Sequence, residues 1–224
     1  MTDHAHMLDR DGAPVCGDQD SFYGVPLAPS ASRIAALLSE SYSSTMNICV
    51  FLSSADLDER YTRPAREFAE LIGSGGHTLV WGGSDTGLMK VVADGVRESG
   101  GRLVGISVDF LRDFAREDSD EMVIAKDLAE RKALLLARSD AVVVMVGGLG
   151  TLDEATEILE LRKHGLLDKP VALLNTVGFY DGLILQLRRM EDEGFLPVPL
   201  VELVLIANEG ADALAHLEDS LGSR

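Results

Sequence analysis

Ala141-Val-Val-Val-Met-Val146 is an apolar, largely β-branched run that leads directly into Gly147-Gly-Leu-Gly-Thr-Leu-Asp-Glu154. A strand that is apolar on both faces is typical of the centre of a parallel sheet covered by helices. A glycine-rich turn after such a strand opens the next helix, whose first N–H groups have no partner within the helix. The segment therefore predicts an α/β fold with an anion-binding corner at the carboxyl end of a strand.

The same alternation of strand and helix continues outward in both directions. Short apolar runs predict further strands at 47–52, 78–81, 102–108, 121–125, 171–174 and 201–206. Apolar residues at helical spacing predict helices at 60–73, 87–99, 127–139, 151–164, 178–193 and 210–221. Repeated βα units predict a doubly wound, mostly parallel, Rossmann-like sheet with helices on both faces. Ligands of such folds bind at the carboxyl ends of the strands.

The amino-terminal part of the chain departs from this pattern. Residues 1–30 mix Asp, Gly, Pro and Ser without periodicity, so we expect a disordered tail there. Ile34, Leu37 and Leu38 predict a short leading helix within 30–44. No second boundary is visible, and residues 31–224 are expected to form one domain.

Composition limits the partners and the compartment. The net charge of −17 disfavours nucleic acid and anionic membranes, but local backbone dipoles still allow a small anionic ligand. No apolar run is long enough to span a bilayer, and the first residues lack a signal-peptide pattern. Two cysteines, Cys16 and Cys49, make neither a disulfide framework nor a zinc site. We expect a cytoplasmic protein without a bound metal.

A second glycine-rich turn, Gly82-Gly-Ser-Asp-Thr-Gly87, follows the strand predicted at 78–81. Two such corners in one sheet predict a single phosphate-binding crevice. Neither turn fits a common nucleotide motif, since Leu88 replaces the P-loop lysine and Asp153 the third glycine of the dinucleotide fingerprint. A structural alternative is that the glycines only allow tight packing, with Thr151 and Glu154 forming a capping box. The candidate binding residues are Gly82, Gly83, Ser84, Gly87, Gly147, Gly148, Gly150 and Thr151.

Several motifs, in matching order, resemble the LONELY GUY family of cytokinin riboside 5′-monophosphate phosphoribohydrolases, often labelled lysine decarboxylases. The family pattern P-G-G-x-G-T-x-x-E is matched at 146–154, with valine in place of proline. The pattern M-H-x-R-K reads Leu-Ala-Glu-Arg-Lys at 128–132, and G-G-G-x-x-G-L-M-G is matched in part at 82–90. The likeness covers roughly residues 47–206.

The resemblance implies hydrolysis of the N-glycosidic bond of a nucleoside 5′-monophosphate to a free base and ribose 5-phosphate, without a cofactor. By position it implies Arg131 and Glu154 as the catalytic pair, with Lys132 beside the nucleotide. A carboxylate near C1′ stabilises the positive charge of the sugar, and an arginine orients it. The resemblance also implies a homodimer or larger homo-oligomer, for which an apolar helix face at Leu159 and Leu166 is a candidate contact.

The departures from the family pattern leave alternatives open. Leu128, Ala129, Ser84 and Lys90 differ from it, so the base is a cytokinin, adenine, another purine or a pyrimidine. A non-catalytic carrier of a nucleotide or a phosphorylated pterin, such as the molybdenum cofactor, is the main rival, and a member with an inactive site is a third. Arg131 has a structural alternative too, as a surface cation paired with Asp127. Nothing marks a lysine as a Schiff-base site for a decarboxylase.

Overall fold

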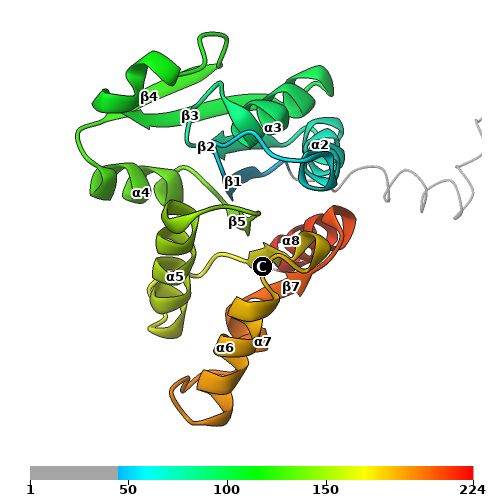
Figure 1. The fold of residues 1–224 in the computed structure, drawn as a ribbon, viewed down its shortest axis with the longest axis vertical. Coiled ribbons are helices and arrows are strands. Elements are labelled where there is room, and N and C mark those ends of the chain that lie inside the picture. The colour runs from blue at the N-terminus through cyan, green and yellow to red at the C-terminus, as the bar shows by residue number, and fades with distance from the viewer. Residues whose placement is uncertain (1–44, 224) are drawn as a thin grey trace, which may run out of the picture. The chain divides into compact units, whose positions relative to one another are not determined.

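The computed structural model describes residues 45–223, so the predicted tail at 1–30 and the predicted helix within 30–44 lie outside the described residues. Seven parallel strands form one sheet in the order β4-β3-β2-β1-β5-β6-β7 (Figure 1). The strands are β1 Asn47–Phe51, β2 Thr78–Trp81, β3 Arg102–Val108, β4 Glu121–Ala125, β5 Ala141–Val144, β6 Val171–Leu174 and β7 Leu205–Ala207. The predicted doubly wound α/β fold is confirmed.

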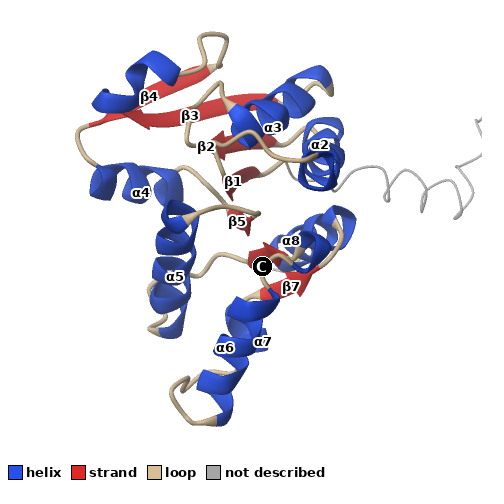
Figure 2. Ribbon diagram, in the orientation of Figure 1, coloured by secondary structure: helices blue, strands red, loops and turns tan. Residues whose placement is uncertain are grey.

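Helices cover both faces of this sheet (Figure 2). One face packs against α2 (Glu59–Ser74), α3 (Gly87–Glu98) and α8 (Gly210–Gly222). The other packs against α4 (Leu128–Ala137), α5 (Leu149–Lys163), α6 (Asp181–Asp192) and α7 (Leu200–Leu203). Within β1, Ile48 and Val50 face the first layer and Cys49 and Phe51 the second, because side chains alternate along a strand.

The order of the strands reverses at β1. Ile48 pairs with Leu79 of β2 on one side and with Ala141 of β5 on the other. Both glycine-rich turns, which follow β2 and β5, therefore lie beside the carboxyl end of β1. This is the topological switch point, where open α/β sheets bind ligands.

The strand predicted at 201–206 is wrong in its first half. Residues Leu200–Leu203 form the short helix α7, and β7 begins only at Leu205. The Glu191 side chain accepts a hydrogen bond of 2.8 Å from the Leu200 amide, and Pro199 caps the helix. Val201 is 81% exposed, so this apolar run is not the buried strand that its composition indicates.

Two further differences concern the segments near the site. Helix α5 starts at Leu149 with Gly148 as its N-cap, so Thr151 lies inside the helix and the predicted capping box is wrong. Two 3₁₀ segments that the periodicity does not indicate are present, η1 at Asp109–Phe114 and η2 at Thr176–Gly178. Within residues 45–223, every helix is too short or too polar to cross a bilayer.

Candidate active site

A cavity of about 460 Å³ opens at the carboxyl ends of the central strands. Its volume falls within the range of roughly 300–1,000 Å³ found for small-molecule sites. The residues that line it are Leu52, Ser53, Ser54, Ala55, Gly82, Ser84, Thr86, Met89, Ser107, Leu111, Phe114, Arg131, Gly148, Gly150, Thr151 and Glu154.

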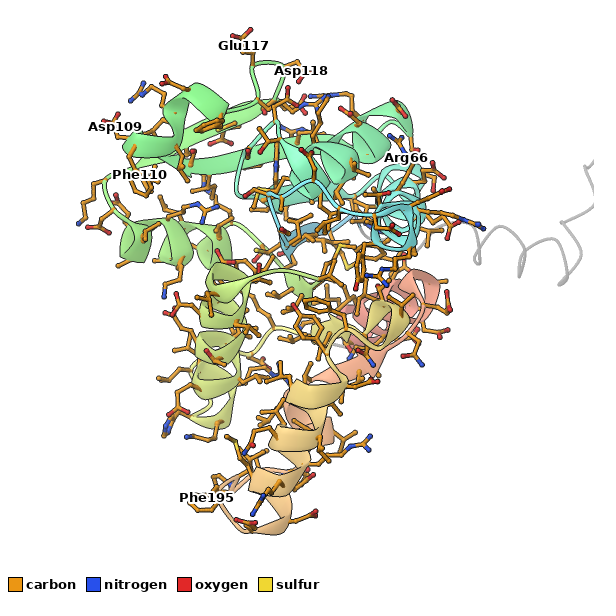
Figure 3. The ribbon with its side chains drawn as sticks, viewed as in Figure 1. Arg66, Asp109, Phe110, Glu117, Asp118 and Phe195 are labelled. Atoms are coloured by element: carbon orange, nitrogen blue, oxygen red, sulfur yellow. The ribbon has the colours of Figure 1, made fainter. Side chains whose placement is uncertain are left out.

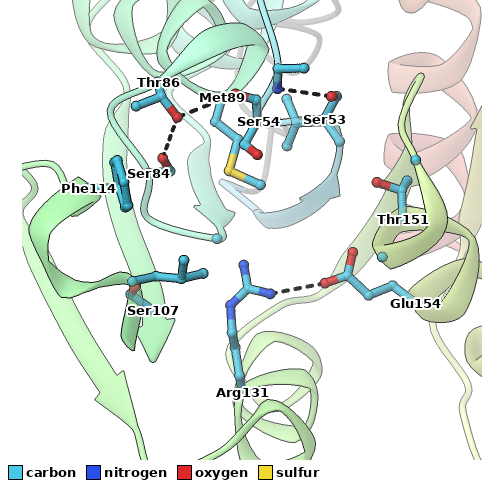
Figure 4. Close-up of a pocket in the computed structure, with 16 residues that line it drawn as sticks. Ser53, Ser54, Ser84, Thr86, Met89, Ser107, Phe114, Arg131, Thr151 and Glu154 are labelled. Atoms are coloured by element: carbon cyan, nitrogen blue, oxygen red, sulfur yellow. Dashed lines mark hydrogen bonds and ion pairs between the residues drawn. The ribbon is translucent and has the colours of Figure 1, made fainter. Parts of the chain in front are cut away.

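Arg131 and Glu154 meet at the base of this cavity (Figure 4). Nη1 of Arg131 lies 3.3 Å from Oε1 of Glu154, and Nε donates a 2.9 Å hydrogen bond to the carbonyl oxygen of Ile106 in β3. The two side chains are only 12% and 11% exposed. Arg131 is therefore not a surface cation paired with Asp127, whose carboxylate instead caps α4 by accepting from the Glu130 amide.

The environment of Glu154 favours its protonated form. Burial raises the pKa of this carboxyl group to about 7, and the neighbouring Arg131 cation only partly opposes that effect. A buried carboxyl group with a pKa near neutrality, facing a cavity beside an arginine, is typical of catalytic acids and bases.

Gly82 allows the Arg131 guanidinium to reach its position. A methyl group at residue 82 would collide with Nη2 of Arg131. The first glycine turn therefore makes room for the Arg131–Glu154 pair, in addition to bending the chain.

The second glycine turn places the start of α5 at the cavity. Gly148 is the N-cap of α5, and no side chain caps the helix there. Gly148 and Gly150 line the cavity, so the N–H groups of the first helical turn, which have no partner within the helix, lie beside it. A Cβ atom at Gly148 or Gly150 would meet no heavy atom within 4 Å. Neither packing nor a positive φ demands glycine at Gly148 or Gly150, so the open space they leave is available to a ligand.

Four of the candidate binding residues do not line the cavity. Gly83 and Gly87 have φ of 76° and 53°, a left-handed conformation that glycine adopts without strain. Gly147 packs against the side chain of Thr151. Lys132 forms ion pairs with Asp153 at 2.9 Å and with Glu157 at 2.5 Å, between α4 and α5.

The cavity also contains residues outside the predicted set. Ser53 and Ser54 follow β1, and Ser107 belongs to β3. Leu111 and Phe114 come from η1, which carries no periodic signal in the sequence. Met89 both packs against the core and lines the cavity. The sequence signal for Ser53 and Ser54 is their position directly after a predicted strand.

The chain is similar in sequence to a known family and to several of its named members. Residues 89–217 match the model of a family described as "Possible lysine decarboxylase". The chain is 33% identical over 174 residues to a cytokinin riboside 5′-monophosphate phosphoribohydrolase of Arabidopsis thaliana, covering 76% of each chain. It is 32% identical to the enzyme of that name from Mycobacterium tuberculosis, covering 75% of this chain and 90% of the relative.

Solved structures with this fold include two proteins of molybdenum-cofactor biology. One is a molybdenum cofactor binding protein from Rippkaea orientalis, with a TM-score of 0.61 and 23% identity over 80% of this chain and 98% of that one. The other is the Moco carrier protein of Chlamydomonas reinhardtii, with a TM-score of 0.61 and 24% identity over 81% of this chain and 100% of that one. At these identities the likeness establishes the fold alone. The family model and the more similar relatives show that the chain belongs to the LONELY GUY family of cytokinin riboside 5′-monophosphate phosphoribohydrolases.

Proposed function

We propose that this protein hydrolyses the N-glycosidic bond of a nucleoside 5′-monophosphate. The observation that carries the proposal is the buried Arg131–Glu154 pair, which lies at the base of a cavity between two glycine-rich turns. A carrier has no need of a carboxylate next to a sugar. No lysine is among the described residues that line the cavity, so a Schiff base with a decarboxylase substrate has no support there.

The residues around the cavity follow an order that matches the phosphate, the ribose and the base of such a substrate. Thr151 and the start of α5 lie on one side, Phe114 lies across from them, and Arg131 and Glu154 lie between (Figure 4). The phosphate fits the helix start, where N–H groups and the dipole favour an anion. The ribose then lies over Glu154, and the base reaches Phe114, Leu111 and Met89.

In the reaction the C1′–N bond breaks and its electron pair leaves with the base, which takes up a proton from solvent while Glu154 returns to solvent the proton that it gains from the attacking water. The ionised carboxylate of Glu154 stabilises the positive charge on the ribose and accepts a proton from the attacking water, whose oxygen bonds to C1′. Among residues 45–223, the Arg131 guanidinium donates only to Ile106 and Glu154, which leaves Nη2 for a sugar hydroxyl. The products are the free base and ribose 5-phosphate.

The test is incubation with a panel of nucleoside monophosphates, including AMP and a cytokinin riboside 5′-monophosphate, with detection of both products. Wild type is expected to cleave at least one, and Glu154→Gln to lose roughly 100-fold or more in kcat. Glu157→Gln is the matched control, because Glu157 lies one turn further along α5, is paired with Lys132 and is outside the cavity. Equal activity in Glu154→Gln and wild type removes Glu154 from the mechanism. Tight binding of a phosphorylated pterin without turnover of any nucleotide favours the carrier instead.

We also propose a homodimer in the cytoplasm. Supporting a second copy, Leu166, Leu185 and Val201 are 74%, 71% and 81% exposed at the α5–α7 end of the described chain, and Phe195 projects beyond α6 (Figure 3). Leu159, the other suggested contact, packs against its own core instead. Light scattering is expected to give twice the chain mass of 24.1 kDa. A stable monomer at micromolar concentration, or a dimer unaffected by Leu166→Asp and Val201→Asp, contradicts this arrangement.

A further inference from the structure

Phe114, which lies across the cavity from the start of α5, is two residues from a cluster of five charged residues, hereafter the Arg116 cluster. Its members are Arg116, Lys90, Asp85, Asp94 and Asp118. Arg116 is only 8% exposed. None of the five residues lines the cavity, whereas Ser84 and Thr86, the neighbours of Asp85 in the chain, do. The reaction described above makes no use of it.

The guanidinium of Arg116 joins three separate parts of the chain. It lies 2.5 Å from Asp94 on α3, 2.5 Å from Asp118 before β4 and 3.2 Å from Asp85 in the first glycine turn. Figure 3 labels Asp118 at the outer turn between η1 and β4. Lys90 adds contacts of 3.0 Å to Asp94 and 3.6 Å to Asp85. Hydrogen bonds from Arg116 hold the pKa of Asp118 below its usual range, so the carboxylate stays ionised.

The backbone around Arg116 holds Phe114 in place. The Arg116 amide donates to the carbonyl oxygen of Gly83 at 2.8 Å, and the Asp85 amide donates to the carbonyl oxygen of Phe114 at 2.8 Å. Phe114 is thus tied to the first glycine turn two residues from a buried cation. Without that cation, Asp85 and Asp94 would share only the half-exposed Lys90 as a partner, and the repulsion between their carboxylates would be less well compensated.

We propose that Arg116 is a positioning residue for base recognition, because it holds Phe114 as the wall against which the base packs. This inference rests on the proposed function and adds a substrate preference to it. Because the Arg116 cluster supports only the base end, its loss should weaken ligands that carry a base and spare those that have only ribose and phosphate. Lys90, which adds to the cluster, stands where the family pattern has glycine.

The experiment compares two ligands in a Glu154→Gln background, which prevents turnover. Dissociation constants of AMP and of ribose 5-phosphate are measured by calorimetry. Arg116→Met is expected to weaken AMP roughly tenfold, the size of loss expected when base stacking is impaired. Ribose 5-phosphate should change less than about twofold, since its contacts lie at α5 and the catalytic pair.

Two matched control variants change residues of η1, the 3₁₀ segment that also carries Phe114. Arg112→Met removes an exposed pair with Asp109, and Phe110→Ala removes a ring that is 69% exposed; both should leave AMP binding unchanged. Phe114→Ala should reproduce the effect of Arg116→Met, and the double variant should be no worse than either alone. Asp94→Asn, which weakens the cluster without removing the buried cation, serves if Arg116→Met does not fold.

The outcomes separate the two proposals. If the parent binds AMP and Arg116→Met and Asp94→Asn weaken both ligands equally, or neither, the positioning role is overturned while the proposed function stands. If the parent binds neither ribose 5-phosphate nor any nucleoside monophosphate of the panel, both proposals fail. Selective loss of AMP supports the positioning role.

Discussion

At the scale of single residues, motif resemblance singled out Arg131 and Glu154 but not the contacts that hold them in place. Arg131 and Glu154 were predicted from motif resemblance, and the structure brings their side chains to 3.3 Å. The contact of Arg131 with the Ile106 carbonyl was not predictable, because it depends on how α4 lies over β3. The same is true of Gly82, whose missing side chain makes room for the guanidinium.

The pKa of Glu154 gives the reaction a defined pH dependence. If the carboxylate is the active form, kcat/KM should fall roughly tenfold per pH unit well below the pKa. Since that pKa is about 7, the plateau should begin near pH 8 and the decline should be evident by pH 6. Initial rates between these limits check it, and a rate that is flat or rises as the pH falls contradicts a carboxylate mechanism.

The same group also links stability to pH. The pKa of Glu154 is raised from 4.5 in the unfolded chain to about 7 in the folded one, so its favourable contribution is present below 4.5 and is lost as the pH rises through 7. Glu154→Gln, which cannot ionise, should therefore match wild type at about pH 4 and exceed it at pH 8 by roughly 1–3 kcal/mol. Urea unfolding at both pH values measures this difference. A variant that is less stable than wild type at pH 8 would show that the ion pair with Arg131 outweighs the burial of the charge.

At the scale of elements, the start of α5 is the decisive segment. The glycine pattern correctly indicated a helix opening after β5, but the helix begins two residues before the predicted Thr151. The error came from reading Thr151 and Glu154 as a local cap, whereas Glu154 is held by Arg131 from α4. Sequence spacing alone does not distinguish a local contact from a tertiary one.

Gly150→Ala should separate stability from binding. Alanine at the second position of α5 meets no neighbouring atom, so unfolding should require roughly 0.5–1 kcal/mol more free energy. The added methyl group enters the ligand space, and KM for the nucleotide should rise about tenfold or more. Gly182→Ala is the matched control, since Gly182 holds the second position of α6 and its Cβ also meets nothing. A rise in KM for both variants, or for neither, contradicts a phosphate position at the start of α5.

At the scale of the whole molecule, strand and helix alternation sufficed to predict the sheet and its switch point. Six of the predicted strands have counterparts in place, while the run at 201–206 is divided between α7 and β7. The η1 wall escaped prediction because residues 109–114 have no periodicity, and two of their three large apolar side chains, Phe110 and Phe114, are more than half exposed. The part of the cavity proposed to hold the base is therefore the part that the sequence predicts least well.

The overall charge gives a prediction that belongs to no single residue. A net charge of −17 repels an anionic substrate before it reaches the cavity, whereas the backbone contacts at α5 act at short range. Raising KCl from about 10 to 150 mM should therefore lower KM for a nucleoside monophosphate about two- to fivefold. Inhibition by the uncharged nucleoside is the control and should not respond. A KM that rises with salt contradicts this account.

The open space above Gly148 and Gly150 also limits which residues the chain tolerates there. An acidic side chain at either place would be attracted to the helix start, as caps generally are, and would strengthen the fold. It would at the same time occupy the proposed phosphate position as a tethered competitor that substrate does not readily displace. Stability of the fold therefore favours an acidic residue at these two positions, whereas turnover favours glycine, which leaves space for the substrate.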